Sequence, residues 1–297
     1  MINSVKKKLI INNKELNSNI NKNINMQNKG LKRKTIDKFY TNPNIVKECM
    51  NLVKQNLNIE ENNLCIEPSA GNGSFISDIK LLFKNYQFYD LEPEHNEIIK
   101  QDYLDYNYSK IDKKFNKIHI IGNPPFGRQS SLAIKFIKKS SEYCDSISFI
   151  LPKSFKKDSL QTHFPLNFHL ICEYDLPENS FLINKQEHDV PCVFQIWVKK
   201  NTQRKIPEKL SPIKYKFVKK KENHDISFRR VGVNAGCIDR ETANKSSQSH
   251  YFIKFDMELT DELFNKLSSI NYECKNNTCG PKSISKPELI KEFNKLF

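Results

Sequence analysis

The sequence contains no apolar run that approaches the roughly 18 residues needed to cross a membrane as a helix. Its first ten residues, MINSVKKKLI, also lack the apolar stretch and the small-residue cleavage site of a signal peptide. We therefore expect a soluble, intracellular protein, either cytoplasmic or nuclear.

Cysteine and histidine do not occur in the grouping that a metal site requires. Most of the eight cysteines stand inside apolar runs such as Leu64–Ile66, which is typical of buried thiols in a reducing compartment. Cys274 and Cys279 are close together in a polar context, but His250 is the only further ligand nearby, and a structural zinc needs four. We expect no metal.

Acidic residues are scarce at both ends of the chain, whose net charge is +14. Residues 1–36 contain nine Lys and Arg against one acid, and residues 201–297 contain nineteen against twelve, whereas residues 37–200 are balanced at 20 against 21. Because Lys and Arg neutralise phosphates and release counterions, this distribution favours a core that acts on a nucleic acid held at its edges. A proteome rich in Lys and Asn would produce the same excess of charge.

Three regions follow from the composition. Residues 1–30 have too few apolar side chains to offset the entropy of ordering, so we expect a disordered basic arm. Residues 31–200 alternate short apolar runs with helical patterns, which predicts one α/β domain. Residues 201–297 form a small basic region that is a candidate target-recognition element.

The α/β domain is expected to be a doubly wound, Rossmann-like sheet of seven mainly parallel strands whose last two form an antiparallel pair. The expected strands are Leu64–Glu67, Gln87–Leu91, Ile98–Gln101, Lys117–Ile121, Ser146–Leu151, His169–Tyr174 and Val193–Lys199. The expected helices are Asn44–Gln55, Gly73–Phe83, Ser130–Ser141 and Ser154–Thr162. In the basic region we expect strands at Ile226–Val233 and Tyr251–Phe255 and helices at Asp261–Ser268 and Pro287–Phe297.

Glycine is scarce, at eight residues, yet Gly71 and Gly73 stand together between an apolar strand and a helix, in the segment Glu67-Pro68-Ser69-Ala70-Gly71-Asn72-Gly73. Glycine allows a positive φ and a close approach of the backbone to a ligand, and the helix that follows offers free amide donors. The third glycine of the dinucleotide fingerprint is missing. The segment favours a nucleotide-like cofactor over a simple turn.

Two further acids end the next two expected strands. Asp90 lies at the end of the second strand, where a carboxylate can accept both hydroxyl protons of a ribose. Asp102 and Tyr103 follow the third strand, where an acid that accepts from an adenine amine stands beside a ring that can stack on the base. Together with the glycine segment, they predict a site for an adenosyl group.

The segment Asn123-Pro124-Pro125-Phe126 ends the fourth expected strand. The amine of an aromatic base is a poor nucleophile because its lone pair is delocalised into the ring. The Asn123 side-chain oxygen and the Pro124 carbonyl can accept the two hydrogens of adenine N6 and aim its lone pair at a methyl sulfonium. Proline holds these acceptors in place, and Phe126 can stack on a flipped base. These four residues are the candidate catalytic group.

In this order of motifs, residues 37–200 resemble the amino-methyltransferases of the gamma arrangement, which use S-adenosylmethionine and carry an Asn-Pro-Pro-Phe motif. The resemblance implies a class I methyltransferase fold and assigns Tyr40 and Thr41, in the segment Phe39–Pro43, to a motif that closes over the methionine part of the cofactor. It implies that the cofactor is bound by Tyr40, Thr41, Glu67, Pro68, Gly71, Gly73, Asp90, Asp102 and Tyr103. Leu151, Pro152 and the region of Phe181 resemble later motifs that shape the base pocket.

The form of these motifs favours the branch that methylates adenine N6 in DNA. The same catalytic motif occurs in enzymes that act on RNA and, less fittingly for basic flanks, in enzymes that methylate a protein glutamine. A catalytically inactive nucleic-acid-binding subunit would be expected to have lost one of the two motifs, and both are intact. The candidate contacts to nucleic acid in the basic region are Lys219, Lys220, Lys221, Arg229 and Arg230.

Overall fold

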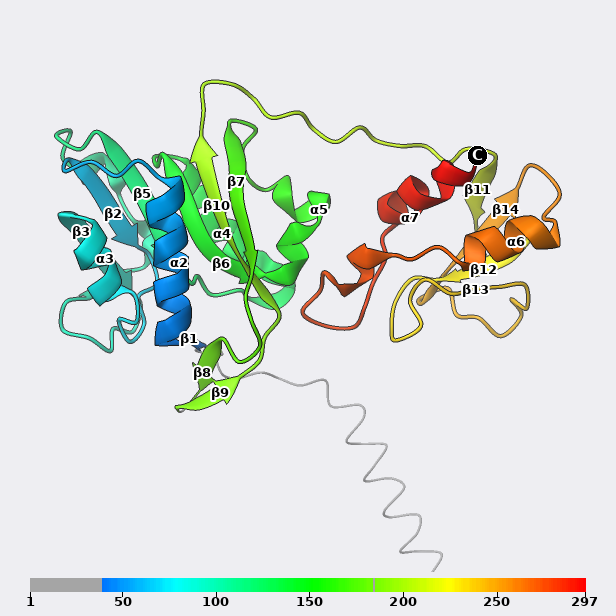
Figure 1. Cartoon of the computed structure of the whole chain (residues 1–297), viewed down its shortest axis with the longest axis horizontal. Coiled ribbons are helices and arrows are strands. Elements are labelled where there is room, and N and C mark those ends of the chain that lie inside the picture. Colours follow the sequence, from blue (N-terminus) through cyan, green and yellow to red (C-terminus); the bar gives the residue numbers. More distant parts are fainter. Residues whose placement is uncertain (1–38, 184) are drawn as a thin grey trace, which may run out of the picture. The chain divides into compact units, whose positions relative to one another are not determined.

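In the computed structural model of the chain, the described residues are 39–183 and 185–297. The arm predicted for residues 1–30 lies outside them. The elements in the first part of the described chain alternate between strand and helix, and most of the helices cover the faces of one large sheet (Figure 1). None of the helices in residues 39–297, Asn184 left aside, combines the length and the apolar composition that crossing a bilayer requires.

The large sheet has seven strands in the order β4-β3-β2-β5-β6-β10-β7. Its strands are β2 (Asn63–Glu67), β3 (Asn85–Asp90), β4 (Ile99–Lys100), β5 (Lys117–Gly122), β6 (Ser146–Pro152), β7 (Phe168–Asp175) and β10 (Cys192–Lys199). Strands β2 to β6 pair in parallel, whereas β10 lies between β6 and β7 and is antiparallel to both. This confirms the expected doubly wound α/β sheet with one antiparallel strand, which is the last of the seven strands along the sequence.

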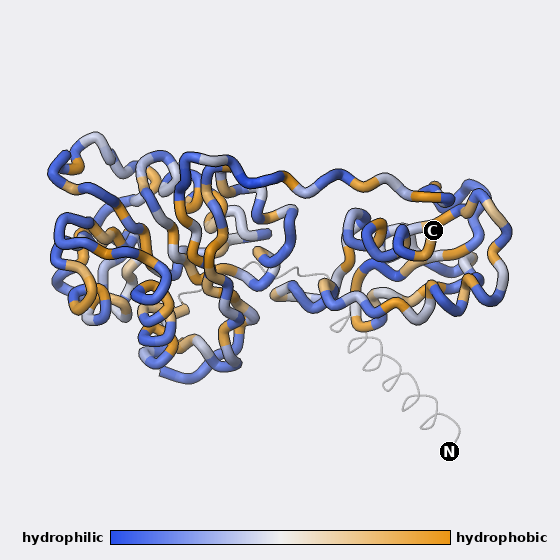
Figure 2. The backbone as a smooth tube through the Cα atoms, turned by 45° about the horizontal axis from the view of Figure 1, so that its top comes forward, coloured by the Kyte–Doolittle hydropathy of each residue, from blue (hydrophilic) through white to orange (hydrophobic). Residues whose placement is uncertain are grey.

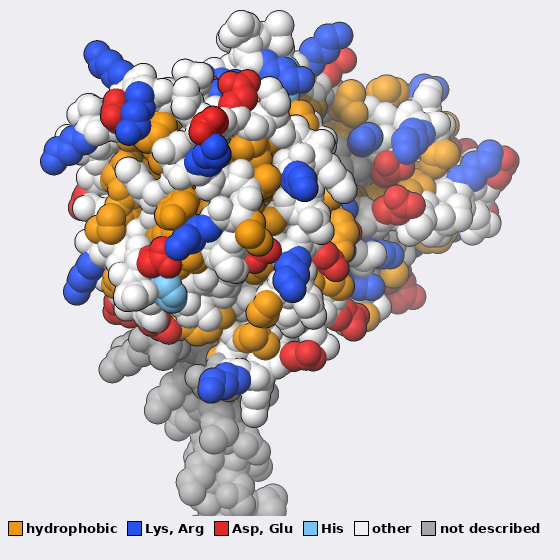
Figure 3. All heavy atoms as spheres, turned by 60° about the vertical axis from the view of Figure 1, so that its left-hand side comes forward, with side chains coloured by type: hydrophobic (Ala, Val, Ile, Leu, Met, Phe, Trp, Pro, Cys, Tyr) orange, Lys and Arg blue, Asp and Glu red, His pale blue; other side chains and the backbone are white. Residues whose placement is uncertain are grey.

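Both faces of this sheet are buried, as the apolar runs of its strands predict. In β2, Cys65 packs on the face that carries α2 (Pro43–Asn56) and α3 (Ile76–Leu82), whereas Leu64 and Ile66 pack on the face that carries α4 (Ser131–Ser141). Figure 2 shows apolar segments along the central strands and polar segments in the connecting loops. The surface on the side of β3 and α3 carries basic and acidic side chains intermixed (Figure 3), in line with the balanced charge of residues 37–200.

Two expected helices differ from the structure. The helix expected at Gly73–Phe83 begins only at Ile76, because Gly73 has a φ of +83° and the chain turns before it coils. The helix expected at Ser154–Thr162 is divided into a 3₁₀ turn, Lys153–Lys156, and the single turn of α5 (Asp158–Gln161). The extended backbone of Lys157, at φ −86° and ψ 136°, separates the two.

A small sheet of three strands was not predicted. It consists of β1 (Tyr40–Thr41), β8 (Phe181–Ile183) and β9 (Gln186–His188), and β1 pairs with β8 through Thr41 opposite Phe181. Strands of two or three residues are too short to show an alternating pattern. Their pairing brings two segments that are distant in the sequence to the same place.

The basic region forms a four-stranded antiparallel sheet with the order β11-β14-β12-β13 and a hydrophobic cluster of its own residues. Its elements are β11 (Tyr215–Val218), β12 (Ile226–Arg229), β13 (Ile238–Asp239), β14 (His250–Phe255), α6 (Asp261–Ser268) and α7 (Lys286–Phe293). The expected helix at 261–268 is confirmed, and the one at 287–297 is α7 followed by a 3₁₀ turn. The strand expected to reach Val233 ends at Arg229, because the chain turns at Gly232, whose φ is +101°.

Candidate active site

The motif residues meet at one edge of the large sheet. Glu67 ends β2, Asp90 ends β3 and Asn123 follows β5, and these three strands are parallel neighbours. The carboxyl ends of parallel strands lie together, and ligands of open α/β sheets bind there. The described residues contain no group of three His, Cys, Asp or Glu side chains that is arranged to hold a metal ion.

The turn after β2 is held by Asp90. One carboxylate oxygen of Asp90 accepts from the amide of Gly71 at 2.8 Å, and the other accepts from the amide of Glu92 at 2.8 Å. Gly71 and Gly73 both have positive φ, of +53° and +83°, so a side chain at either position would strain the turn. The glycine segment and the strand-end acid, which were predicted separately, form one hydrogen-bonded unit.

Tyr40 closes over this turn from β1. Its hydroxyl donates to the Glu94 carboxylate at 2.5 Å, and the Glu94 amide donates to the Gly71 carbonyl at 3.0 Å. A Cβ added at Gly71 would lie 3.4 Å from Cε1 of the Tyr40 ring. The predicted contact of Tyr40 with the cofactor region is therefore supplemented by Glu94, which sequence reasoning missed because Tyr40 is 54 residues away.

Glu67 is a buried acid with a free oxygen. Its side chain is 2% exposed, lies against Gly122, and its Oε2 has no hydrogen-bond partner among the described residues. Burial, and secondarily the negative charge of Asp90, raise the pKa of the Glu67 carboxyl to about 8. Such a group is compensated when a cationic ligand enters beside it. The amino group and sulfonium of S-adenosylmethionine therefore fit this site.

The side chain of Asn123 is oriented by the segment before α2. Its Nδ2 donates to the Phe39 carbonyl at 3.1 Å and to the Thr41 hydroxyl at 3.3 Å. Because a carbonyl can only accept, the amide nitrogen must face Phe39, and Oδ1 is turned away from it. Ser69 adds a third restraint, since its hydroxyl donates to the Asn123 carbonyl at 3.2 Å. Ser69 and Phe39 were not among the predicted site residues.

The remaining residues of the catalytic motif connect β5 to α4. Pro124 is buried, and Pro125 and Phe126 are half-buried. Pro68, in the glycine segment after β2, is also buried. The Phe126 carbonyl accepts from the amides of Leu132 and Ala133 in α4. Gly127 has a φ of +69°, and any Cβ there would come within 2.8 Å of the Leu132 side chain.

Asp102 and Tyr103 are not brought together at the edge of the sheet. Asp102 caps the 3₁₀ turn that follows, through the Leu104 amide at 2.8 Å, and the backbone amide of the preceding Gln101 donates to the Asp90 backbone carbonyl. Tyr103 is 1% exposed, its hydroxyl is hydrogen-bonded to Ser140, and its ring stacks on a phenylalanine of α4. The turn after Asp102 directs this ring into the core, so it is not available to stack on a ligand.

The predicted nucleic-acid contacts lie at one end of the four-stranded sheet. Lys219, Lys220 and Lys221 are exposed and follow β11, while Arg229 and Arg230 stand at the end of β12. Both strands are antiparallel to β14, so their carboxyl ends lie toward the amino end of β14. Arg230 stacks over Tyr251 with its guanidinium carbon 5.4 Å from the ring centre.

No protein-family model and no curated protein matches the sequence. Among solved structures, a protein provisionally described as an RNA methyltransferase from Pyrococcus horikoshii aligns with a TM-score of 0.44 and 19% identity over 58% of this chain and 92% of its own. A type I restriction-modification methyltransferase subunit from Streptococcus thermophilus aligns with a TM-score of 0.41 and 15% identity over 56% and 46%. The 23S rRNA methyltransferase ErmE aligns with a TM-score of 0.41 and 11% identity over 56% and 71%. The strand order, with β10 as its one antiparallel strand, is the Rossmann-like arrangement expected of a class I methyltransferase.

Proposed function

We propose that this protein transfers a methyl group from S-adenosylmethionine to N6 of an adenine in a nucleic acid, with DNA as the favoured polymer. The observation that carries the proposal is the fixed orientation of Asn123. Its nitrogen is occupied by Phe39 and Thr41, so its oxygen is presented as an acceptor before any substrate arrives. Acceptors that are already oriented do not have to reorganise during the reaction, which is the main source of electrostatic catalysis.

The proposed chemistry requires two acceptors on one amine. Oδ1 of Asn123 and the carbonyl of Pro124 accept the two N6 hydrogens, so the nitrogen lone pair is withdrawn from the ring and becomes available for attack. The two prolines restrict the backbone that carries these acceptors. The half-exposed ring of Phe126 provides a face for the adenine, which must leave a duplex to reach the site.

S-adenosylmethionine supplies the electrophilic methyl group when it is bound. The glycine turn at Gly71 and Gly73 leaves room for the ligand to approach the backbone, and the Glu67 carboxylate balances its positive charge. The Asp90 carboxylate uses one acceptor position on each oxygen for the backbone and retains others for ribose hydroxyls. We assign the adenine amine to Asp102, which follows the backbone contact between Gln101 and Asp90. Tyr103, being buried, has no part in this assignment.

The choice of polymer rests on the motifs and on the charge. The Glu-Pro-Ser-Ala-Gly form of the glycine segment and the Phe-Tyr-Thr-Asn-Pro segment favour DNA, and RNA is the alternative. A protein glutamine as acceptor fits less well with a region of residues 201–297 that carries nineteen basic against twelve acidic residues.

The test is methyl transfer from tritiated S-adenosylmethionine to separate pools of unmethylated DNA and RNA, followed by mass spectrometry of the nucleosides. We expect N6-methyladenine in DNA. N6-methyladenine in RNA alone would change the polymer and keep the chemistry. Cofactor binding without transfer to either pool would contradict the proposal and indicate an inactive binding subunit.

Asn123→Ala is expected to reduce transfer by at least 100-fold, as loss of an oriented catalytic group does, while cofactor affinity measured by calorimetry changes less than about threefold. Asn56→Ala is the matched control, because Asn56 is an exposed asparagine at the end of α2 that bonds only to its own helix. Retained transfer in Asn123→Ala would exclude the proposed mechanism.

A further inference from the structure

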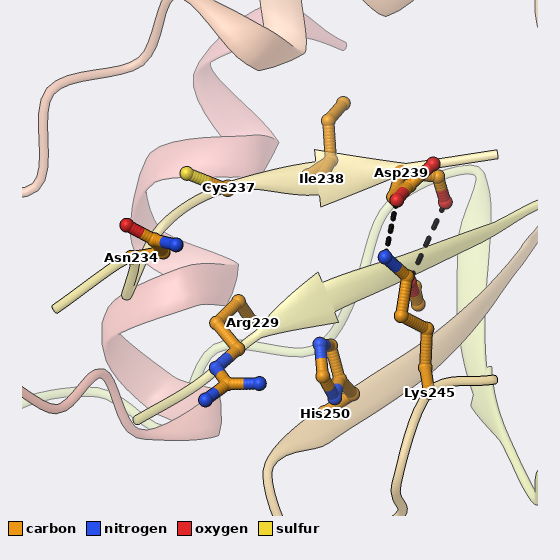
Figure 4. Close-up of a pocket in the computed structure, with 8 residues that line it drawn as sticks. Arg229, Asn234, Cys237, Ile238, Asp239, Lys245 and His250 are labelled. Carbon is orange, nitrogen blue, oxygen red and sulfur yellow. Dashed lines mark hydrogen bonds and ion pairs between the residues drawn. The ribbon is translucent and has the colours of Figure 1, made fainter. Parts of the chain in front are cut away.

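The basic region contains a cavity of about 290 Å³ that the proposed methyl transfer does not use. It lies between β12, β13 and the amino end of β14 (Figure 4). Its polar and charged lining includes Arg229, Asn234, Asp239, Lys245 and His250. Its volume is near the lower end of the range for small-molecule sites. A cavity of this volume is larger than a bare ion requires.

The Arg229 side chain is held at Nε, and its two terminal nitrogens are available to a ligand. Its Nε donates to the Val231 carbonyl at 2.8 Å, and no hydrogen bond or ion pair within residues 39–297 occupies its two terminal nitrogens. A Cβ at Gly232 would lie 3.4 Å from Nη2 of Arg229, and the φ of +101° also favours glycine there. The turn therefore holds the guanidinium without covering it.

The charge in the cavity is net positive. Lys245 forms an ion pair with Asp239 (Figure 4). The Asp239 carboxylate also accepts from the Glu241 amide at 2.8 Å. These contacts hold the pKa of Asp239 below its usual range, so this carboxyl is ionised and its charge is balanced by Lys245. The charge of Arg229 remains uncompensated.

His250 contributes a polar atom from a buried ring. The residue is 8% exposed, and its Nδ1 lies 3.0 Å from the Ser249 hydroxyl and 3.1 Å from the Ser246 carbonyl, so these two groups occupy Nδ1. Nε2 has no partner within the described part of the chain. Burial, together with the nearby charges of Arg229 and Lys245, lowers the pKa of His250 despite the opposing effects of the hydrogen bond with the Ser246 carbonyl and of the Asp239 charge. An anion beside Nε2 would favour the protonated ring, in which both nitrogens are donors.

We propose that this cavity binds a phosphate group of the nucleic-acid target, with the terminal nitrogens of Arg229 forked on two phosphate oxygens and the Asn234 amide and His250 beside them. This inference rests on the proposed function. Guanidinium suits phosphate because its donors match two oxygens in one plane. Because the cavity of about 290 Å³ is larger than a phosphate group, we expect it to hold part of the attached sugar as well. Internal phosphodiesters and a terminal phosphomonoester present the same chemistry, and the experiment separates them.

The first measurement is the affinity for 3′-labelled oligonucleotides, with and without a 5′-phosphate, at several salt concentrations. We expect Arg229→Gln to weaken binding on the order of tenfold and to reduce the slope of log K against log salt by about one. Lys266→Ala is the control, because it removes the same charge from an exposed position on α6. Unchanged unfolding midpoints establish that each variant is folded.

The second measurement is the NMR titration of the His250 ring with inorganic phosphate, with His250→Gln used to assign its signals. We expect phosphate to shift the signals and raise the apparent pKa of the ring in the wild type, and to do neither in Arg229→Gln. The affinity measurement separates the two kinds of phosphate. If a 5′-phosphate on the oligonucleotide raises affinity only in the wild type, the ligand is the phosphate at the strand end. If the 5′-phosphate has no effect while Arg229→Gln still weakens binding, the ligand is an internal phosphate.

Two results have distinct meanings. Equal affinity and salt slope for the wild type and Arg229→Gln would overturn the inference. Binding that depends on Arg229 in a protein that methylates no nucleic acid would refute the proposed function and leave the phosphate site established.

Discussion

At the scale of single residues, Glu67 shows what sequence can and cannot tell about a site. Its place at the end of a strand and before two glycines matches the glycine motif of the amino-methyltransferases, and this resemblance predicts that it binds the cofactor. Its burial could not be predicted, because the packing of Gly122 against its side chain joins residues 55 positions apart. The result is a carboxyl whose pKa of about 8 makes its charge dependent on pH in the physiological range.

This shift links stability to pH with a definite sign. The pKa of Glu67 rises on folding, so the folded state binds more protons than the unfolded state between about pH 4.5 and pH 8. The free energy of unfolding should therefore decrease between pH 6 and pH 8, by about 1–2 kcal/mol more in the wild type than in Glu67→Gln. Urea denaturation at both pH values measures this difference. Parallel pH profiles for the two proteins would show that Glu67 is already ionised at pH 6.

For Asn123 the sequence predicted the role of the side chain, and for Tyr103 it did not. The acceptor role of Asn123 followed from chemistry alone, whereas the groups that orient it, Phe39 and Thr41, precede it by more than 80 residues. Tyr103 was assigned to the ligand because aromatic residues beside an acid fit an adenosyl site. Its burial is set by the aromatic surface of α4, with which its side chain packs.

At the scale of elements, the long strands and helices could be predicted because their apolar residues repeat over several turns or pleats. The β1-β8-β9 sheet could not, since its strands have two or three residues. This small sheet nevertheless determines the geometry of the site. Thr41 is paired with Phe181 in the sheet and hydrogen-bonded to Asn123, so it couples β1 to the end of β5.

Thr41→Val tests this coupling, because it removes the acceptor and keeps the shape of a side chain that is 3% exposed. One neutral hydrogen bond contributes about 1 kcal/mol, so kcat should fall about threefold to tenfold with little change in KM for the cofactor. Thr162→Val, at an exposed hydroxyl that bonds to Ser159, should have no effect. A change in KM alone would indicate that Thr41 acts on binding and does not position Asn123.

At the scale of the whole molecule, the uneven charge along the sequence agrees with the placement of the basic residues. Lys219, Lys220 and Lys221 are exposed at the end of the four-stranded sheet that also carries Arg229. The sequence indicated a basic patch but gave no sign of the cavity, which depends on the pairing of β12 with β13 and β14.

Replacing these three lysines by alanine should weaken binding of oligonucleotides of any sequence to a similar degree. We expect the slope of log K against log salt to fall by about two to three, with kcat unchanged at saturating nucleic acid. Fluorescence anisotropy and steady-state transfer assays measure the two quantities. A loss that is confined to particular base sequences would mean that the lysines read bases and do not contact phosphates.

The position of β10 also constrains how the chain reaches this structure. Within the described sheet, β7 pairs only with β10, and β10 is made after β7 and the β8-β9 hairpin. On a ribosome, β6 therefore remains an unpaired edge and β7 has no place in the sheet until residue 199 has emerged. Pairings between segments distant in the sequence form slowly. The side of the sheet formed by β10 and β7 is consequently completed late, after β2, β3 and β5, which carry the motif residues, have been synthesised.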